Sequence, residues 1–162
     1  TDDSLIVSQF SYDQKLADLD DLAKVKIPAN SLAIETAREH GDLRENAEYH
    51  MAKDEQKLLL ARQAEIQGEV MRAKPTDFSD APEDFIGIGS IVTLSDQENG
   101  QTQKYTVLGA WDSDPDNNVL SYLTPLGQKL LGEKIGNIVE TDVEGNVQSW
   151  KVEALSRWVD AQ

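Results

Sequence analysis

Cysteine is absent from the chain, which excludes a disulfide framework and a thiolate metal site. No apolar run approaches the roughly 20 residues that cross a bilayer, and the N-terminus lacks a basic-then-apolar signal pattern. We therefore expect a soluble, cytoplasmic protein with no membrane partner. Aromatic residues are scarce, at 6% of the sequence, and hydrophobic residues make up 39%, so only a modest core can form.

Basic residues are also few: 15 Lys and Arg stand against 30 Asp and Glu, which gives a formal net charge of -15. Tight neutralisation of nucleic-acid phosphates requires clustered cations. The charge balance therefore argues against a protein that sequesters free nucleic acid, although it allows a local basic patch.

The composition changes between residues 75 and 88. The chain before this point is rich in the good helix formers Ala, Leu, Glu, Lys, Gln and Arg. The chain after it is rich in Val, Thr, Gly and Asn, and residues 74–82 between them, with two prolines, are typical of a linker. We therefore predict an α+β protein with domains at residues 1–75 and 83–162.

Two helices are predicted in the N-terminal domain, over residues 12–39 and 47–73. Small and apolar residues recur every seven positions in the second helix, at Ala52, Leu59, Ile66 and Ala73. The few residues around Gly41 that join the helices force them to be antiparallel neighbours. The pattern predicts an antiparallel coiled-coil hairpin about 40 Å long, at about 1.5 Å per residue.

Pro28 interrupts the pattern of the first helix. Proline has no amide donor and clashes with the preceding turn, so we expect a kink or a local break that could act as a hinge. Asn30 or Ser31 would then cap the restarted helix.

The C-terminal domain alternates like a small β-sheet. Asn99-Gly100 is a hairpin signal between two predicted strands, and Thr124-Pro125 is typical of a helix start. The predicted strands cover residues 90–94, 104–108, 119–123, 138–141 and 147–155, and the predicted helix covers residues 125–131. The result is a twisted sheet with one short helix on one face.

The turn of the hairpin carries two carboxylates three residues apart, Asp42 and Glu45. Carboxylates on one exposed face can bind a hard cation such as Mg²⁺ together with ligands from a partner. The same spacing is that of a capping box, in which Asp42 begins a helix and Glu45 reaches back. The two interpretations do not exclude each other. A free-standing zinc hydrolase using His40, His50 and the nearby acids is a further alternative, but the spacing matches no standard zinc pattern.

The residues of this turn carry a family resemblance. The segment Ala37-Arg-Glu-His-Gly-Asp-Leu-Arg-Glu-Asn-Ala-Glu-Tyr-His50 resembles the signature of the bacterial Gre transcript-cleavage factors, GreA and GreB. Thr124-Pro-Leu-Gly-Gln-Lys-Leu-Leu-Gly132 resembles the Ser-Pro-x-x-x-x-Leu-x-Gly segment of that family's C-terminal domain. The resemblance covers roughly residues 16–157.

The resemblance implies a transcription elongation factor that is not itself an enzyme. Its hairpin would enter the secondary channel of bacterial RNA polymerase as a monomer, while an FKBP-like domain docks at the rim. Asp42 and Glu45 would help the polymerase to hold Mg²⁺ and to cleave backtracked RNA near its 3′ end. A modulator or inhibitor that enters the channel without cleavage is the alternative, and relatives of that kind have altered tip acids.

Further contacts with RNA or polymerase are implied at Arg38, Leu43, Arg44, Asn46, Tyr49 and Lys53. The three basic residues match a patch that contacts the extruded RNA, although each could also be an ordinary solvated charge. Leu43 would pack against the polymerase, and Asn46 and Tyr49 would order the tip or touch substrate.

The beginning of the chain departs from the family pattern. Thr1-Asp-Asp-Ser4 is not an initiator sequence, and residues 4–10 replace the usual opening of the first helix. We therefore expect a C-terminal portion of a longer Gre-like protein.

Overall fold

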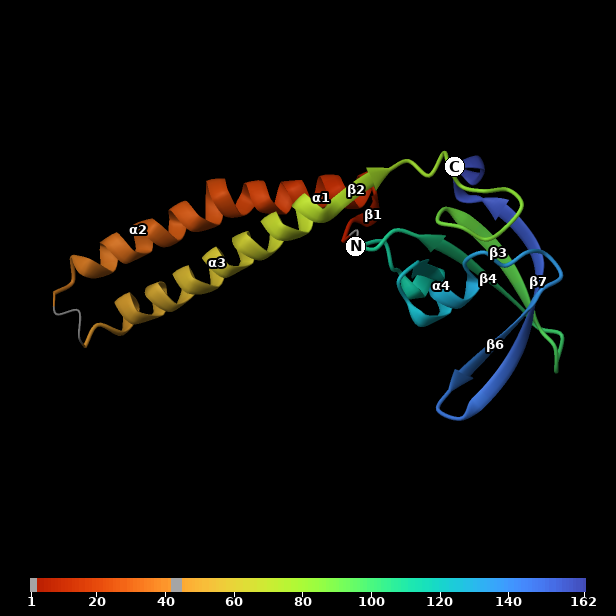
Figure 1. Ribbon diagram of the computed structural model, residues 1–162. Coiled ribbons are helices and arrows are strands. Elements are labelled where there is room, and N and C mark those ends of the chain that lie inside the picture. The colour runs from red at the N-terminus through yellow and green to blue at the C-terminus, as the bar shows by residue number, and fades with distance from the viewer. Residues whose placement is uncertain (1–2, 42–44) are drawn as a thin grey trace. The chain divides into compact units, whose positions relative to one another are not determined.

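The computed structural model describes residues 3–41 and 45–162 (Figure 1). The chain forms two compact units, one of them Tyr12–Ala73 and the other the chain up to Ser11 together with Lys74–Gln162. In the described ranges no helix has both the length and the apolar character required to span a membrane.

The first unit is the predicted helical hairpin. It contains α1 (Gln9–Asp21) from Tyr12 onward, a π-helical turn (Leu22–Lys26), α2 (Ile27–Arg38) and α3 (Ala47–Arg72). Figure 1 shows α2 and α3 side by side, and residues of both helices are in contact. The heptad prediction is confirmed for Ala52 and Ile66, which are buried, while Leu59 is half-buried.

Pro28 does not break the first helix. The chain passes from α1 through the π-helical turn directly into α2, and the amide of Ile27 donates to the carbonyl of Leu22 five residues earlier. A π turn contains one extra residue, so it absorbs the missing amide donor and the ring of a proline without ending the helix. The predicted cap at Asn30 or Ser31 is wrong, because both residues lie inside α2, where Asn30 is buried.

The π turn also keeps the buried face of the helix in phase. Leu22 and the next inward-facing residue, Ile27, are five positions apart, and Asn30, Ile34 and Ala37 then follow at spacings of three and four. A spacing of five across one turn is what the extra residue permits. The buried stripe therefore continues to the last turn of α2.

The second unit contains a five-stranded sheet in the order β5-β4-β3-β7-β6. The strands are β3 (Ser90–Asp96), β4 (Thr102–Leu108), β5 (Val119–Ser121), β6 (Ile138–Val143) and β7 (Asn146–Arg157). The β4–β5 pair is parallel, and the other pairs are antiparallel. All five strands fall where the sequence predicts them, and the predicted α+β class is confirmed.

One short helix, α4 (Pro125–Leu130), follows β5. Thr124 caps it as predicted, since its hydroxyl accepts from the amide of Gly127 at 3.1 Å. Leu130 is fully buried and belongs to the core of the sheet unit. The core consists of Ile86, Val92, Leu94, Val107, Leu130, Val139 and Val152.

A two-stranded sheet that the sequence did not predict joins β1 (Leu5–Ser8) to β2 (Ala73–Thr76). Its first strand is held by the loop after β4, where the amide of Ala110 donates to the carbonyl of Ile6 at 2.7 Å. Only glycine fits at Gly109, because a Cβ there would lie 2.6 Å from the Cα of Val7.

Asp112 fixes the junction between β1 and α1. Its carboxylate accepts from the amide of Ser8 at 3.0 Å, from the amide of Gly109 at 2.8 Å, and from the hydroxyls of Ser8 and Ser11. The hydroxyl of Ser8 in turn accepts from the amide of Ser11 at 3.0 Å, which satisfies a donor in the first turn of α1. Ser8, Ser11 and Asp112 all belong to the sheet unit, so this network lies within that unit.

Candidate functional site

The candidate site is the turn between α2, which ends at Arg38, and α3, which begins at Ala47. Of the residues predicted for this site, Asp42, Leu43 and Arg44 lie outside the described residues. Glu45 is described, and its side chain is exposed. Gly41 has a φ of 109°, a conformation that glycine adopts without strain, which explains a glycine where the chain leaves α2.

Asn46, the residue directly before α3, connects the two helices. Its Oδ1 accepts from the backbone amide of Tyr49 at 3.1 Å, so Asn46 is the N-cap of α3. Its Nδ2 donates to the backbone carbonyl of Ala37 in α2 at 2.7 Å. One side chain therefore satisfies an unpaired amide of one helix start and bonds a carbonyl of the opposite helix end.

The position of this cap bears on the role of Glu45. In a capping box the acidic residue lies three positions after the cap and within the first turn. Glu45 instead lies one position before the cap residue Asn46. The interpretation of Glu45 as the second member of a capping box is therefore wrong, and the start of α3 does not require its carboxylate.

An open recess of about 540 Å³ lies at the turn. His40 and Glu45 line it from the loop, and Asn46, Ala47 and Glu48 line it from the start of α3. Within residues 3–41 and 45–162, no three His, Asp or Glu side chains are placed to hold a metal ion together.

Two of the predicted contact residues lie close together where α2 ends and α3 begins. The guanidinium carbon of Arg38 lies 5.9 Å from the centre of the Tyr49 ring, within the range of a cation–π contact. Tyr49 also meets the ring of His50 edge-on, with 5.7 Å between the ring centres. These contacts hold a positive charge beside the cap residue.

Lys53 lies one turn further along α3. It is four residues after Tyr49, so the two side chains share one face of the helix. Its Nζ donates to Oε1 of Gln56 at 2.9 Å. Arg38, Tyr49 and Lys53 thus follow one another away from the turn, whereas the structure gives no placement for Arg44.

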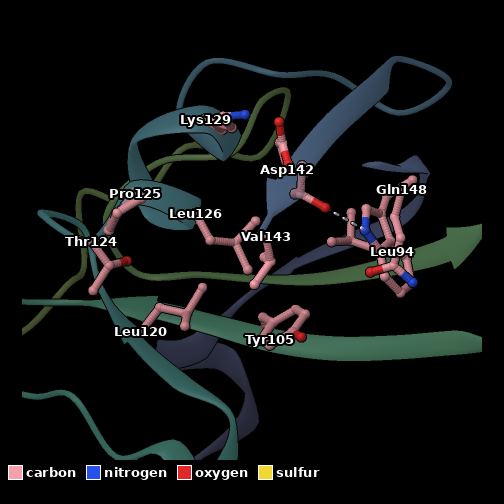
Figure 2. Close-up of a pocket in the computed structure, with 12 residues that line it drawn as sticks. Leu94, Tyr105, Leu120, Thr124, Pro125, Leu126, Lys129, Asp142, Val143 and Gln148 are labelled. Carbon is pink, nitrogen blue, oxygen red and sulfur yellow. Dashed lines mark hydrogen bonds between the residues drawn. The ribbon is translucent and has the colours of Figure 1, made fainter. Parts of the chain in front are cut away.

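The sheet unit contains a second concave feature, a pocket of about 380 Å³ (Figure 2). Leu120, Leu126 and Val143 point toward one another in it, from β5, from α4 and from the β6–β7 hairpin. Tyr105 and Trp150 add aromatic surface, and the indole Nε1 of Trp150 donates to the hydroxyl of Thr141 at 3.2 Å.

The sequence did not reveal this pocket. Leu126 packs against the core of the sheet unit and also lines the pocket. The sequence pattern nearest the pocket is Thr124-Pro125, which predicts the start of α4 and so the position of Leu126 in that helix. It does not predict which residues lie opposite Leu126.

Family models match both parts of the chain. Residues 5–74 match the family described as "Transcription elongation factor, N-terminal", and residues 81–157 match "Transcription elongation factor, GreA/GreB, C-term". The chain belongs to the GreA/GreB family of transcription elongation factors.

Curated relatives agree with this GreA/GreB assignment. Transcription elongation factor GreA of Treponema pallidum (strain Nichols) is 35% identical over 152 residues, which are 94% of this chain and 94% of that protein. GreA of Nautilia profundicola is 33% identical and covers 92% of each chain. GreA of Borreliella burgdorferi is 39% identical over 127 residues, 78% of this chain, but the match spans only 14% of that relative.

Solved structures that match the chain include the GreA factor homolog 1 protein of Thermus thermophilus, at 20% identity and a TM-score of 0.43. A GreA/GreB factor from Nitrosomonas europaea has 16% identity and the same TM-score. Each match covers 94% of this chain and 99% of the other. The family assignment rests on the sequence matches.

The two hydrogen bonds of the Asn46 side chain predict how the start of α3 responds to substitution. Asn46→Ala removes both hydrogen bonds, so we expect the free energy of unfolding of the hairpin to fall by about 1–2 kcal/mol. Hydrogen exchange of the Tyr49 amide should accelerate about tenfold, because that amide loses its acceptor. Asn46→Asp is the matched control: it keeps the acceptor, loses the donor to Ala37, and should leave the Tyr49 amide protected. If the exchange rate of the Tyr49 amide is unchanged in Asn46→Ala, Asn46 does not cap α3.

Proposed function

We propose that this chain stimulates RNA polymerase to cleave backtracked RNA by inserting the tip of its hairpin into the secondary channel. The observation that carries the proposal is the exposed carboxylate of Glu45, next to Asn46, whose side chain bonds the end of α2 to the start of α3. Membership of the GreA/GreB family supports the same role. The chain would act as a monomer and would not itself be an enzyme, since the polymerase performs the cleavage.

Asp42 and Glu45 are the proposed catalytic residues. Asn46 caps α3, so the carboxylate of Glu45 stays available as a hard oxygen donor of the kind that Mg²⁺ prefers. Two carboxylates are too few to hold Mg²⁺ alone, and the aspartates of the polymerase would supply the other ligands. The ion would supply a nucleophilic water and stabilise developing charge in a two-metal cleavage.

The basic side chains near the turn would bind the extruded RNA. The guanidinium of Arg38 lies within cation–π range of the Tyr49 ring, and Lys53 lies on the same face of α3 as Tyr49. Phosphate contacts of this kind position a strand without reading its sequence. Arg44 would add a third cation, and Leu43 would pack against the wall of the channel.

The tip acids are tested in stalled, backtracked elongation complexes supplied with Mg²⁺. We expect the unmodified chain to accelerate RNA cleavage, and Asp42→Asn and Glu45→Gln each to reduce that acceleration about 100-fold, since several kcal/mol of charge stabilisation are lost. Glu48→Gln is the matched control, because Glu48 lines the same recess from within α3 and should retain activity within about threefold. Competition binding shows whether each variant still engages the polymerase.

Two results of that assay would reject this role. No acceleration by the unmodified chain would leave the alternative of a channel-binding modulator that acts without cleavage. Full activity in both tip variants would show that the carboxylates do not take part in the reaction.

We propose that the pocket of the sheet unit is the surface of this chain that docks on the polymerase. It is lined mainly by apolar side chains, and Val143 at its mouth is 65% exposed. Apolar surface of this kind gains free energy when a partner side chain covers it. Docking there would hold the factor on the polymerase while the hairpin tip engages the RNA.

The docking proposal predicts a selective effect of charge at the pocket. We expect Val143→Glu to weaken binding to RNA polymerase about tenfold, because a carboxylate would have to be desolvated in an apolar contact. Val147→Glu introduces the same charge on the same β-hairpin, at a residue that is 54% exposed and does not line the pocket. Fluorescence anisotropy of labelled protein measures both affinities. Equal loss in the two variants would indicate a general charge effect and would contradict docking at the pocket.

A further inference from the structure

The hairpin interface contains one buried amide side chain, that of Asn30 in α2. Its side chain is among the few polar groups that are buried in the described ranges, with a residue exposure of 4%. Its Nδ2 donates to the backbone carbonyl of Ala52 in α3 at 2.9 Å and lies 3.4 Å from Oε2 of Glu55. A polar group in such a position costs free energy unless it is hydrogen-bonded, and here it crosses from one helix to the other.

Small side chains make up much of the buried interface around Asn30. The buried residues nearest the turn are Ile34 and Ala37 on α2 and Ala52 on α3. Alanines make shallow contacts, and small side chains permit several offsets with similar packing. The hydrogen bond is more selective, since each residue of offset moves a carbonyl by about 1.5 Å and rotates it by about 100°.

The contact of Asn30 has a counterpart nearer the turn. Asn30 of α2 donates to a carbonyl of α3, and Asn46 at the start of α3 donates to the carbonyl of Ala37 in α2 at 2.7 Å. Asn30 and Ala37 are seven residues apart, which is about two turns of helix. Two amide contacts in opposite directions therefore bracket the last two turns of α2.

We propose that Asn30 is a positioning residue that fixes the register of α2 against α3 and thereby the position of the tip loop. Its consequence for RNA cleavage rests on the proposed function. A slip of one turn would displace one helix end by about 5.4 Å. Catalytic groups tolerate displacements of only about 1 Å, so a slipped hairpin would carry its carboxylates out of reach.

The substitution Asn30→Leu distinguishes a role of Asn30 in helix register from a role in the stability of the fold. Leucine has a similar volume and can fill the interface without a buried polar group, and such replacements are often neutral or stabilising. A residue that merely supports the fold would cause loss of activity together with loss of stability. A register residue would cause loss of activity while the thermal midpoint stays unchanged or rises.

The register is measured directly by spin labels, because the chain has no cysteine of its own. Labels are attached at Leu32→Cys on α2 and Met51→Cys on α3, at positions that are 63% and 72% exposed. With Asn30 present we expect one narrow distribution of label distances by pulsed electron paramagnetic resonance. With Asn30→Leu we expect a broadened distribution or a second population displaced by about 5 Å.

The control is Ser31→Leu, which introduces the same side chain at the adjacent exposed position of α2. It should keep the single distribution and retain cleavage within about twofold, whereas Asn30→Leu should lose at least about tenfold. Asn30→Ala, which removes the amide without filling the interface, should give the same change in distances if the leucine variant fails to fold.

The label distances test the register role of Asn30 whether or not the proposed function is correct. An unchanged distance distribution in both Asn30 variants overturns the register role, whatever happens to cleavage. A changed distribution with full cleavage overturns the link between register and the tip. If the unmodified chain stimulates no cleavage, the proposed function fails, and the distances alone still decide whether Asn30 sets the register.

Discussion

The side chain of Asn46 bonds the end of α2 to the start of α3, and the position of Glu45 beside it depends on that link. A helix that ends leaves carbonyl groups without partners, and a helix that begins leaves amide groups without partners. Asn46 accepts from the Tyr49 amide, and it donates to the Ala37 carbonyl, which also accepts from the amide of His40, so one side chain bonds the start of α3 to the end of α2. Because a side chain after the acidic loop does this, the carboxylate of Glu45 does not have to cap α3.

The two helices are held together by few large side chains. Ala37 and Ala52 form much of the interface near the turn, and the buried Asn30 crosses it. This arrangement suits a slender hairpin, since small residues let the helices approach closely. The proposed register role of Asn30 relies on the directional hydrogen bond that crosses this interface.

The local elements could be predicted because their signals are local. The repeat through Ala52 and Ile66 gave α3, and Thr124-Pro125 gave the capped start of α4. The alternation of apolar residues gave the five strands of the larger sheet. In each case the residues that determine the element lie within a few positions of one another, so periodicity and capping rules suffice.

The remaining features depend on partners that are distant in sequence. Asn30 reads as a helix cap after Pro28, and only the carbonyl of Ala52, 22 residues away, explains why it is buried inside α2. The strand β1 is fixed by Asp112, which is 104 residues from Ser8. The cap at Asn46 was missed because Asp42 offered an equally good local pattern. The roles of Asp42, Leu43 and Arg44 rest on the family resemblance and remain predictions.

The central claim is that the tip acids and RNA polymerase hold Mg²⁺ together. The most direct test is the rate of RNA cleavage in backtracked complexes as a function of Mg²⁺ concentration, with the unmodified chain, with Asp42→Asn and with no factor. Shared binding predicts that the unmodified chain lowers the half-saturating Mg²⁺ concentration about tenfold, a common size for coupling between two bound species. Asp42→Asn should abolish that shift. An identical half-saturating concentration in all three cases, with cleavage still accelerated, would contradict the account.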